Sequence, residues 1–293
     1  MPEGDTLHRT AAALRDVLLG REVIAARGRP DGVPLGRVVG SRIDRVEAVG
    51  KHLLVGFDSG ATLHTHLRMH GSWHRYRAGE PWRRSAARAV AVVEVPGVVA
   101  VCFDAPTVEL LDTRAVALHP VLRALGPDLA TPDADVEEVV RRLRSPARAA
   151  QPIGEALLDQ TAGAGLGNVY RSEVCFIERV DPFAPVGSLP DETLRQLVVT
   201  GSKLLRANAD GGPRTTIPDA LGAPPGAGGP RRGGEQLWVY GRSGRPCRRC
   251  GTPIRSRRSR SGSGDLVRTV YWCPTCQPAV DQPAVSSMRT PGR

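Results

Sequence analysis

The first third of the chain consists of short stretches in which apolar residues either alternate with polar ones or run together. Turn signals such as Asp58-Ser59-Gly60 and Pro96-Gly97 separate several of these stretches. Short runs of this kind between turn residues predict β-strands. The predicted strands are residues 23–26, 43–49, 52–57, 61–67, 72–76, 89–95, 98–103 and 108–111. We therefore expect an antiparallel sandwich or barrel over residues 20–115.

Apolar stripes of helical period lie on both sides of this region. The stripe in residues 5–19 consists of Leu7, Ala11, Leu14 and Leu18, with Asp5 suited to cap a helix and Gly20 to end it. After residue 116 the period becomes helical again and predicts helices at 133–143, 153–160, 168–177 and 190–207. The expected fold is α+β, with an N-terminal helix plus an antiparallel β-sandwich followed by a helical C-terminal domain.

The charge of the chain indicates a polyanionic partner. The 293 residues include 40 Lys plus Arg against 30 Asp plus Glu, and residues 236–264 contain eight arginines and no acid. Nucleic acid is the leading partner for such a block, and a solvated basic face is the alternative. We find no apolar run that could span a bilayer and no secretory signal, so a cytoplasmic location is expected, with no membrane partner.

Lysine is almost absent from this basic chain, which contains only Lys51 and Lys203. Arginine is used wherever a positive charge suffices, so a lysine hints at a compact point charge or a proton transfer. An incidental surface lysine is an equally weighted alternative for either residue.

Four of the six cysteines form two pairs, Cys247-x2-Cys250 and Cys273-x2-Cys276, with 22 residues between them. Two such knuckles joined by a hairpin are typical of a structural zinc site in which four thiolates close the coordination shell. Disulfides or four incidental cysteines are the alternatives, and the absent signal peptide disfavours disulfides. Cys102 and Cys175 lie in apolar runs and are expected to be small buried side chains.

A glycine-rich turn precedes the helix predicted at 168–177. Gly163, Gly165 and Gly167 lie directly before Asn168. Exposed amides at a helix N-terminus suit a phosphate oxygen, and Asn168 can add a donor or cap the helix. A tight turn without any ligand explains the same residues.

The start of the chain, MPEGDT, carries chemistry of its own. Methionine before proline is normally removed, which would leave Pro2 as an N-terminal secondary amine beside Glu3. Such an amine has a reference pKa of about 7.7–8.0 against about 10.4 for lysine, so it is neutral far more often at pH 7. It can form a cationic iminium with a carbonyl compound, and Glu3 beside it can transfer protons.

The N-terminal Pro-Glu pair, the glycine-rich turn and the two cysteine pairs occur together in one known family. The chain resembles the formamidopyrimidine-DNA glycosylase and endonuclease VIII family of base-excision repair enzymes, closer to the endonuclease VIII branch. The resemblance is carried by Pro2-Glu3-Gly4, GKHLLVGF around Lys51, THLRMHGSW at 65–73, GLGNVYRSEV at 165–174, WVYGRSGRPCRRCGTPI at 238–254 and RTVYWCPTCQ at 268–277.

The resemblance implies roles for particular residues. Pro2 matches the family's nucleophile, Glu3 its general acid/base and Lys51 its essential hairpin lysine, in a bifunctional glycosylase and lyase that acts by β,δ-elimination. The implied DNA contacts are Asn168 and Arg268 on phosphates, Arg68, Met69 and His70 in the gap left by a flipped-out base, and Tyr240 and Arg242 on further phosphates. For Met69, burial beneath a strand is the alternative.

The sequence also departs from the family pattern. Thr6 stands where a glutamate is common, the spacing between the zinc knuckles is long, and residues 217–234 do not look able to form the ordered loop that covers flipped 8-oxoguanine. We therefore expect oxidised pyrimidines as substrates, with oxidised purines as the alternative. A non-catalytic DNA-binding paralogue and a zinc-stapled RNA-binding or ribosome-associated protein are the other hypotheses.

The expected organisation combines these features. It comprises a catalytic β-sandwich domain (1–115), a helix–two-turn–helix DNA-binding domain (116–216), a flexible segment (217–234), a zinc-finger β-hairpin (235–278) and a disordered tail (279–293), with the stretch from Gln277 onward looking unstructured. One structural zinc ion and no organic cofactor are expected. The partner is damaged DNA, a duplex with a flipped-out base or a single strand, and the protein is expected to be a nucleoid-associated monomer of bacterial type.

Overall fold

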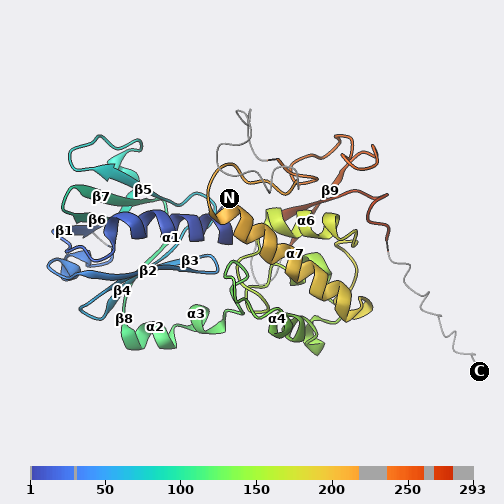
Figure 1. Cartoon of the computed structure of the whole chain (residues 1–293), viewed down its shortest axis with the longest axis horizontal. Helices are drawn as coiled ribbons and strands as arrows, with labels where there is room; N and C mark the ends of the chain where they lie inside the picture. The colour runs from blue at the N-terminus through green and yellow to red at the C-terminus, as the bar shows by residue number, and fades with distance from the viewer. Residues whose placement is uncertain (1, 30–31, 218–235, 261–266, 280–293) are drawn as a thin grey trace, which may run out of the picture.

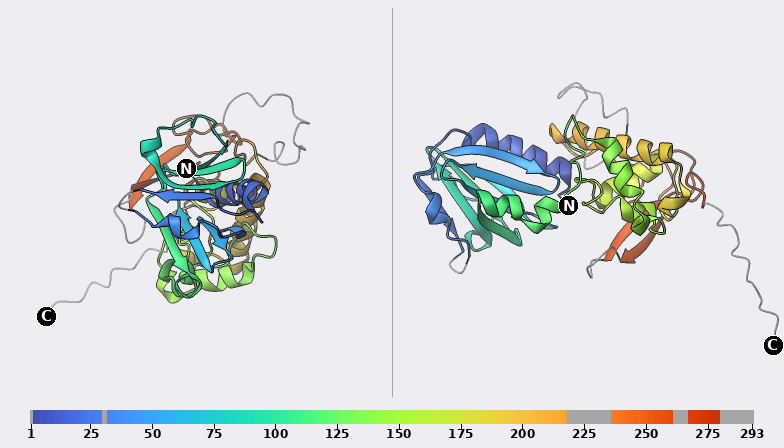
Figure 2. Two further views of the ribbon diagram at one scale, coloured as in Figure 1. Left: turned by 90° about the vertical axis from the view of Figure 1, so that its left-hand side faces the viewer. Right: turned by 90° about the horizontal axis from the view of Figure 1, so that it is seen from below.

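The computed structural model describes residues 2–29, 32–217, 236–260 and 267–279, arranged as two halves joined near the N-terminus (Figures 1 and 2). The first half contains helix α1 (Gly4–Leu18) and two antiparallel four-stranded sheets, ordered β1-β6-β7-β5 and β2-β3-β4-β8. Their strands are β1 (Ala25–Gly28), β2 (Ile43–Val49), β3 (His52–Phe57), β4 (Ala61–His66), β5 (Ser72–Arg77), β6 (Ala89–Val95), β7 (Val98–Phe103) and β8 (Thr107–Asp112). The predicted sandwich is confirmed.

The core of the sandwich comes from the inward-facing positions of both sheets. Leu53 and Val55 of β3 pack with Val93 and Ala100 of the opposite sheet, and the free thiol Cys102 is buried among them as expected. The pattern follows from strand geometry, because alternate side chains of each strand point to the same face. The other face of β3 and β4 carries histidines and is treated below.

Helix α1 lies along the sandwich and reaches the junction between the halves (Figure 1). Its predicted apolar stripe, Leu7, Ala11, Leu14 and Leu18, is buried in the sandwich core. Gly20 follows the helix with φ of +75°, a conformation that glycine adopts without strain. Because α1 also packs against α7, its N-terminal turn is held by both halves.

The second half is helical. Its α-helices are α4 (Val136–Leu143), α5 (Ile153–Ala156), α6 (Asn168–Ile177) and α7 (Asp191–Ala209). Helices α2 (Thr113–Leu118) and α3 (Pro120–Ala124) lead to it from the sandwich, with α2 packed on β4 and β8 (Figure 1). Short 3₁₀ turns occur in both halves. The first half contains η1 (Leu35–Val38) and η2 (Ala86–Arg88), and the second contains η3 (Pro146–Arg148) and η4 (Val186–Ser188). Cys175 of α6 lies in the apolar core here, where burial raises the pKa of its thiol to about 12.

Two helical predictions need correction. The helix expected at 153–160 ends at Ala156, because the Asp159 carboxylate accepts hydrogen bonds from the backbone N–H and hydroxyl of Thr161 and turns the chain. Helices α2 and α3 were not predicted, since neither is long enough to show a periodic stripe. They begin at the side-chain caps Asp112 and His119.

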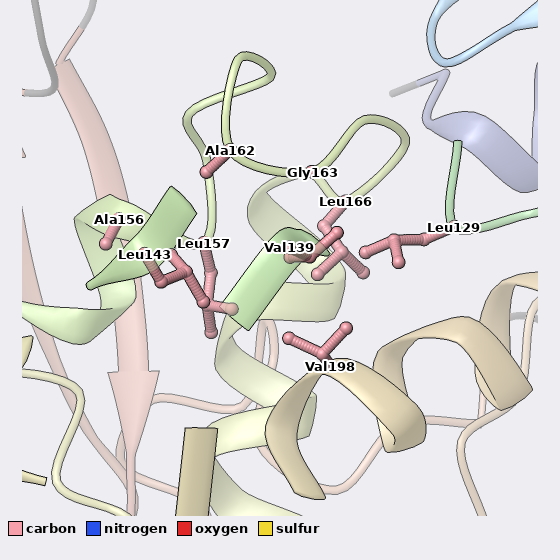
Figure 3. Close-up of a pocket in the computed structure, with 9 residues that line it drawn as sticks. All are labelled: Leu129, Val139, Leu143, Ala156, Leu157, Ala162, Gly163, Leu166 and Val198. Carbon is pink, nitrogen blue, oxygen red and sulfur yellow. The ribbon is translucent and has the colours of Figure 1, made fainter. Parts of the chain in front are cut away.

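A small gap lies in the helical core beneath the glycine turn (Figure 3). Its volume is about 10 Å³, and its nine lining residues, among them Val139, Leu166 and Val198, are all apolar. A space of this size without polar partners does not hold an ordered ligand. We interpret it as a packing gap of the core.

The cysteine hairpin consists of β9 (Arg255–Arg260) and β10 (Val267–Trp272), which pair antiparallel. It packs on α6 through a separate apolar cluster that includes Phe176, Val239 and Ile254. The predicted flexible segment lies outside the described residues apart from Ile217, as does the predicted tail apart from Ala279. The expectation that the chain is unstructured from Gln277 is wrong at that residue, which is buried.

Within the described part of the chain, no helix combines the length and apolar character needed to cross a lipid bilayer.

Candidate active site and nucleic-acid interface

A cleft of about 870 Å³ lies between the two halves. It is lined by the start of α1, by β3 and β4 with the loop after β4, by α3, and by the N-terminus of α6 and strand β10. Eight predicted site residues line it, namely Pro2, Glu3, Lys51, Arg68, Met69, Asn168, Tyr240 and Arg268. His70 and Arg242 are not among the lining residues.

Glu3 is completely buried and bridges the halves. One carboxylate oxygen, Oε1, accepts from the backbone N–H of Val169 at 2.8 Å, and the other, Oε2, accepts from those of Gly167 at 3.0 Å and Tyr170 at 3.4 Å. These amides form the N-terminus of α6, where a negative charge is stabilised by the helix dipole. Of the two readings of the glycine turn, the structure therefore favours a turn without a bound phosphate, since a carboxylate of the same chain already accepts from these amides.

The glycines of the turn make this close approach possible. A Cβ on Gly167 would lie within 2.6 Å of Cγ and Oε1 of Glu3, and a Cβ on Gly4 would lie 2.9 Å from the Cα of Gly165. The Gly4 N–H also donates to the Gly165 carbonyl at 2.9 Å. The start of α1 thus packs backbone to backbone on the turn, which no larger residue permits.

A buried ion pair holds the same helix end. The Arg214 guanidinium donates to both Asp5 carboxylate oxygens at 2.8 Å and to the Thr6 hydroxyl at 3.1 Å. Asp5 and Arg214 are both buried, and paired burial of this kind fixes orientation because each charge lacks water. Thr6, the departure from the family pattern, is thus part of the contact that positions Pro2 and Glu3.

Asp128 forms a second link between the halves. Its Oδ2 atom accepts from the Gly50 N–H at 2.7 Å and lies 2.8 Å from Nε2 of His8. Gly50 has φ of +58° and immediately precedes Lys51, so Asp128 positions the turn that carries this lysine.

Lys51 extends from the β2–β3 turn into the wall of the cleft. Its Nζ atom donates to the Leu166 carbonyl at 2.5 Å. Burial lowers the pKa of Lys51 to about 8, with the Glu3 charge opposing the shift and Arg268 adding to it. This amine therefore changes charge within the physiological range. Lys203, by contrast, is exposed on α7, as expected for an incidental surface lysine.

The loop between β4 and β5 projects Arg68, Met69 and His70 outward. All three side chains are exposed, and Met69 exposes 52% of its surface. Arg68 adopts φ of +46°, an uncommon conformation for a residue with a side chain. Burial of Met69 beneath a strand, the alternative reading of the sequence, is wrong.

The opposite wall is formed by α6 and the cysteine hairpin. Asn168 is buried, and its amide nitrogen donates to the Thr269 carbonyl at 3.1 Å, which ties β10 to the start of α6. Arg268 precedes Thr269 and lines the cleft, and the ring of Tyr240 packs edge-on against that of Tyr271, with centroids 5.0 Å apart. This wall therefore combines a cation with aromatic rings.

Unlike Tyr240 and Arg268, Arg242 does not line the cleft, and its side chain contacts the backbone of its own segment. Its guanidinium donates to the carbonyls of Trp238 and Pro246, the latter at 2.9 Å. Two arginines of the basic block also pack on aromatic rings. The guanidinium carbon of Arg249 lies 4.5 Å from the ring centroid of Phe176, and that of Arg257 lies 3.7 Å from the ring centroid of Phe183. Part of the positive charge therefore serves the packing of the hairpin.

The four cysteines of the two knuckles converge at one end of this hairpin. Sγ of Cys247 lies 3.9 Å from that of Cys276, and Sγ of Cys250 lies 3.5 Å from that of Cys273. All four sulfurs lie within 4.8 Å of one another, which suits a tetrahedral ion with metal–sulfur bonds of about 2.3 Å. Gln277 fixes the second knuckle, donating to the Val180 carbonyl and accepting from the Cys273 N–H.

Several residues of the site were missed from the sequence. Glu173 of α6 is buried and accepts from the backbone N–H groups of residues 238–240 and from the Thr216 hydroxyl. Burial raises its pKa, and these hydrogen bonds oppose the shift. Four histidines and a glutamate also line the cleft, namely His52, His64, His66, Glu109 and His119. The alternating histidines of LHTH in β4 were the available signal for part of this set.

Comparison with known proteins defines the class. The family model "Formamidopyrimidine-DNA glycosylase N-terminal domain" matches residues 1–117, and "Formamidopyrimidine-DNA glycosylase H2TH domain" matches residues 125–217. A DNA-(apurinic or apyrimidinic site) lyase Nei2 of Mycolicibacterium smegmatis is 39% identical, covering 95% of this chain and all of the relative. A protein of Streptomyces coelicolor named "Probable endonuclease 8 2" is 40% identical, covering 94% of each chain.

The fold is shared with solved structures. The Fpg (MutM) of Lactococcus lactis, in complex with DNA that contains N7-benzyl-Fapy-dG, superimposes with a TM-score of 0.76 at 24% identity and covers 95% of this chain and all of its own. Sandwich, helices and cysteine hairpin around one cleft are thus the architecture of a class of DNA glycosylases. The chain belongs to the formamidopyrimidine-DNA glycosylase family, on its endonuclease 8 side. The predicted class of enzyme, a DNA glycosylase and AP lyase, is confirmed.

Proposed function

We propose that this protein is a base-excision-repair DNA glycosylase with AP lyase activity that removes oxidised bases, foremost pyrimidines, through a Schiff base on the N-terminal Pro2. The observation that carries the proposal is the convergence of Pro2, Glu3 and Lys51 in one cleft between the halves. Relatives named endonuclease 8 at 38–40% identity support the class of enzyme. Oxidised purines are the alternative class of lesion.

Pro2 is the proposed nucleophile. After removal of the initiator methionine, its secondary amine attacks C1′ of the damaged nucleotide, expels the base and forms an iminium. The iminium withdraws electrons from the sugar, so the 3′ and then the 5′ phosphate leave by β,δ-elimination. Because Glu3 is fixed by three backbone N–H groups, the adjacent Pro2 is held at a defined place in the cleft.

Glu3 and Lys51 serve this chemistry in different ways. Glu3 protonates the sugar ring oxygen as it opens and carries protons in later steps. Lys51, charged below about pH 8, places a cation next to the departing groups. Both side chains contact the turn before α6, so the helical half fixes their positions relative to each other.

The DNA lies across the cleft in this proposal. Arg268 and Asn168 hold phosphates on one side with Tyr240, and Arg68, Met69 and His70 fill the space that the flipped-out nucleotide leaves in the duplex. The exposure of Met69 at the tip of its loop supports this assignment. Arg242 acts by bracing the backbone of residues 238–246 beside these contacts.

One zinc ion held by Cys247, Cys250, Cys273 and Cys276 is proposed to stabilise the hairpin. The ion supplies structural rigidity, because four thiolates leave no position for a substrate. The protein is proposed to act as a monomer on damaged DNA, associated with the bacterial nucleoid.

Borohydride trapping tests the proposal. Incubation with duplex DNA that contains an abasic site, followed by borohydride reduction, is expected to give a covalent protein–DNA adduct with the wild type and a much lower yield with Pro2→Gly, whose primary amine lacks the proline ring. Mass spectrometry of the active protein is expected to show that the methionine is absent, since an amide nitrogen cannot form the iminium. Equal trapping by Pro2→Gly would refute the role of Pro2, and DNA binding without any adduct would favour a non-catalytic paralogue.

A further inference from the structure

The face of sheet β2-β3-β4-β8 opposite the sandwich core carries a cluster of histidines at the cleft. The register places His52 of β3 opposite His66 of β4, and His64 of β4 opposite Glu109 of β8. His119 joins them from the junction of α2 and α3. His52 and His64 are buried, whereas Glu109 is partly exposed.

These side chains form a continuous hydrogen-bonded row. Nδ1 of His52 lies 2.8 Å from Nε2 of His64, and Nδ1 of His64 lies 2.7 Å from Oε2 of Glu109. Nε2 of His119 lies 3.2 Å from the same carboxylate oxygen. The row thus runs along the wall of the cleft, from His52 through the buried His64 to Glu109, a carboxylate that water reaches.

The surroundings assign one tautomer to each ring. The Leu122 N–H donates to Nδ1 of His119, so this ring carries its proton on Nε2 and donates it to Glu109. The Glu109 carboxylate is an acceptor, so His64 carries its proton on Nδ1. Nε2 of His64 then accepts from Nδ1 of His52. The ring of His52 is left with an unprotonated Nε2 atom.

The charge state of the rings agrees with this assignment. Burial lowers the pKa of His52 to about 3 and also lowers that of His64, so both rings are neutral near pH 7 and hold one proton each. The neighbouring cations and imidazoles act in the same direction, namely Lys51, His66 and His119.

A metal ion fits this cluster less well than protons do. The donor atoms of His64, Glu109 and His119 lie within 4.8 Å of one another, close enough to surround a cation. Coordination by Nε2 of His119 needs the ring proton on Nδ1, where the Leu122 N–H already donates. Binding of a metal would therefore break the N-terminal cap of α3.

The proposed active site needs a proton acceptor other than Glu3. Both oxygens of Glu3 already accept backbone N–H groups at the N-terminus of α6, so each proton that Glu3 takes up weakens those contacts. We propose that His52, His64 and Glu109 form a proton relay that takes protons from the reacting sugar and moves them along the cleft wall to Glu109 during the elimination steps, an inference that rests on the proposed function.

The transfer is balanced at each atom. A C–H bond of the iminium-linked sugar breaks, its electron pair expels the phosphate, and the proton reaches Nε2 of His52 directly or through one water. The Nδ1 proton of His52 passes to Nε2 of His64, and the Nδ1 proton of His64 passes to Oε2 of Glu109. Reverse transfer restores the resting tautomers and returns a proton to the cleft for the next protonation.

Single-turnover assays on abasic-site duplex DNA separate the relay from nucleophilic attack. We expect Glu109→Gln and His64→Gln to give borohydride adducts at the wild-type yield and to cleave the strand slower by about 10²-fold. We expect added imidazole to restore cleavage by His52→Ala, because a small base replaces the missing ring, whereas a packing defect would not respond. His74→Gln is the matched control, since His74 hydrogen-bonds to Ser72 and Tyr76 in the other sheet.

The outcomes distinguish the two levels of the proposal. Normal trapping together with wild-type cleavage by Glu109→Gln would overturn the relay and leave the proposed function intact. Slow cleavage by His52→Ala that imidazole does not restore would likewise overturn the relay. The same imidazole experiment tests the relay if Glu109→Gln fails to fold. Absence of an adduct with the wild type would remove the proposed function and the relay with it.

Discussion

The Glu3 carboxylate joins two tasks in one side chain. It caps α6 through the N–H groups of Gly167, Val169 and Tyr170, and it directly follows the proposed nucleophile Pro2. A charge at a helix N-terminus is stabilised by the dipole and by the free N–H groups. The same bonds that join the halves of the protein therefore fix the start of the chain in the cleft.

Gly167→Ala tests this coupling. The new Cβ would lie within 2.6 Å of the Glu3 carboxyl group, so Glu3 and Pro2 must shift. We expect trapping and cleavage to fall by about 10²-fold, the effect of a displacement of about 1 Å in an active site. Gly36→Ala is the control, because nothing lies within 4 Å of its added Cβ. Equal activity of the two variants would contradict the role assigned to Glu3.

Lys51 sets the alkaline side of the pH profile. Its pKa of about 8 means that the ammonium form is present below this pH and is lost above it, whereas the N-terminal amine, with a reference pKa of about 7.7–8.0, must lose its proton to attack. We expect a narrow bell-shaped profile of cleavage with a maximum near pH 8. Single-turnover rates of Lys51→Gln are expected to be lower and to lack the alkaline decline. A decline that persists in this variant would exclude Lys51 as its source.

Helix α6 and the histidine face of the sheet are the elements that shape the cleft. Residues 168–176 of α6 are all buried, since α1 packs at its N-terminus, the hairpin at its side, and Glu173 holds the backbone of residues 238–240. Strands β3 and β4 use one face for the core and the other for imidazoles. These elements are therefore buried on both sides, and Glu173, His52 and His64 inside them have hydrogen-bond partners.

The histidine face predicts sensitivity to acid. His52 and His66 have native pKa values of about 3 and about 4, against 6.5 for an unperturbed ring. As pH falls from about 6.5 to about 4, only the unfolded chain binds protons at these rings, so the free energy of unfolding decreases in this window. Chemical denaturation at a series of pH values should show a weaker decrease for the double variant His52→Gln, His66→Gln. The exposed His70→Gln serves as control and should keep the full decrease.

The two halves of the molecule and the hairpin have separate apolar clusters, and contacts at the junction link them. The sandwich, the helices and the cysteine hairpin each have their own apolar cluster. The links between the halves include the Asp5–Arg214 pair, Asp128 and the bonds from Glu3. The cleft is therefore placed where both halves can contribute residues and where DNA can enter.

Removal of the metal should unfold the cysteine hairpin without unfolding the sandwich. Chelation, or Cys250→Ser, is expected to release the hairpin that carries Arg268 and Thr269 while the sandwich stays folded on its own core. Affinity for abasic-site duplex DNA should fall by about tenfold or more, because hydrogen bonds to charged phosphates contribute on the order of 1.5–3 kcal/mol each. Fluorescence anisotropy at fixed salt measures the loss, and circular dichroism reports the sandwich. Unchanged affinity would contradict a role for the hairpin in DNA binding.

Much of the fold follows from local pattern. The eight strands, α1, α6 and α7 were predicted within a few residues, because each shows an apolar period over its whole length. The short helices α2 and α3 and the early end of α5 were not, since side-chain caps and the Asp159 turn set them. Motifs predicted eight residues that line the cleft, yet Arg242 and the amides before Asn168 have partners within the chain that no motif reveals.

The sequence by itself determined the strands and long helices, the cysteine pairs, the basic block and the chemistry available at Pro2 and Glu3. These depend on residue type and on spacing along the chain. Only the tertiary structure decided that Glu3 caps a helix 165 positions away, that Thr6 and Arg214 share a contact, and that histidines from three different segments form one row. Such contacts depend on strand register and on the packing of one half on the other, because burial leaves a polar group no partner except the one that the fold brings to it.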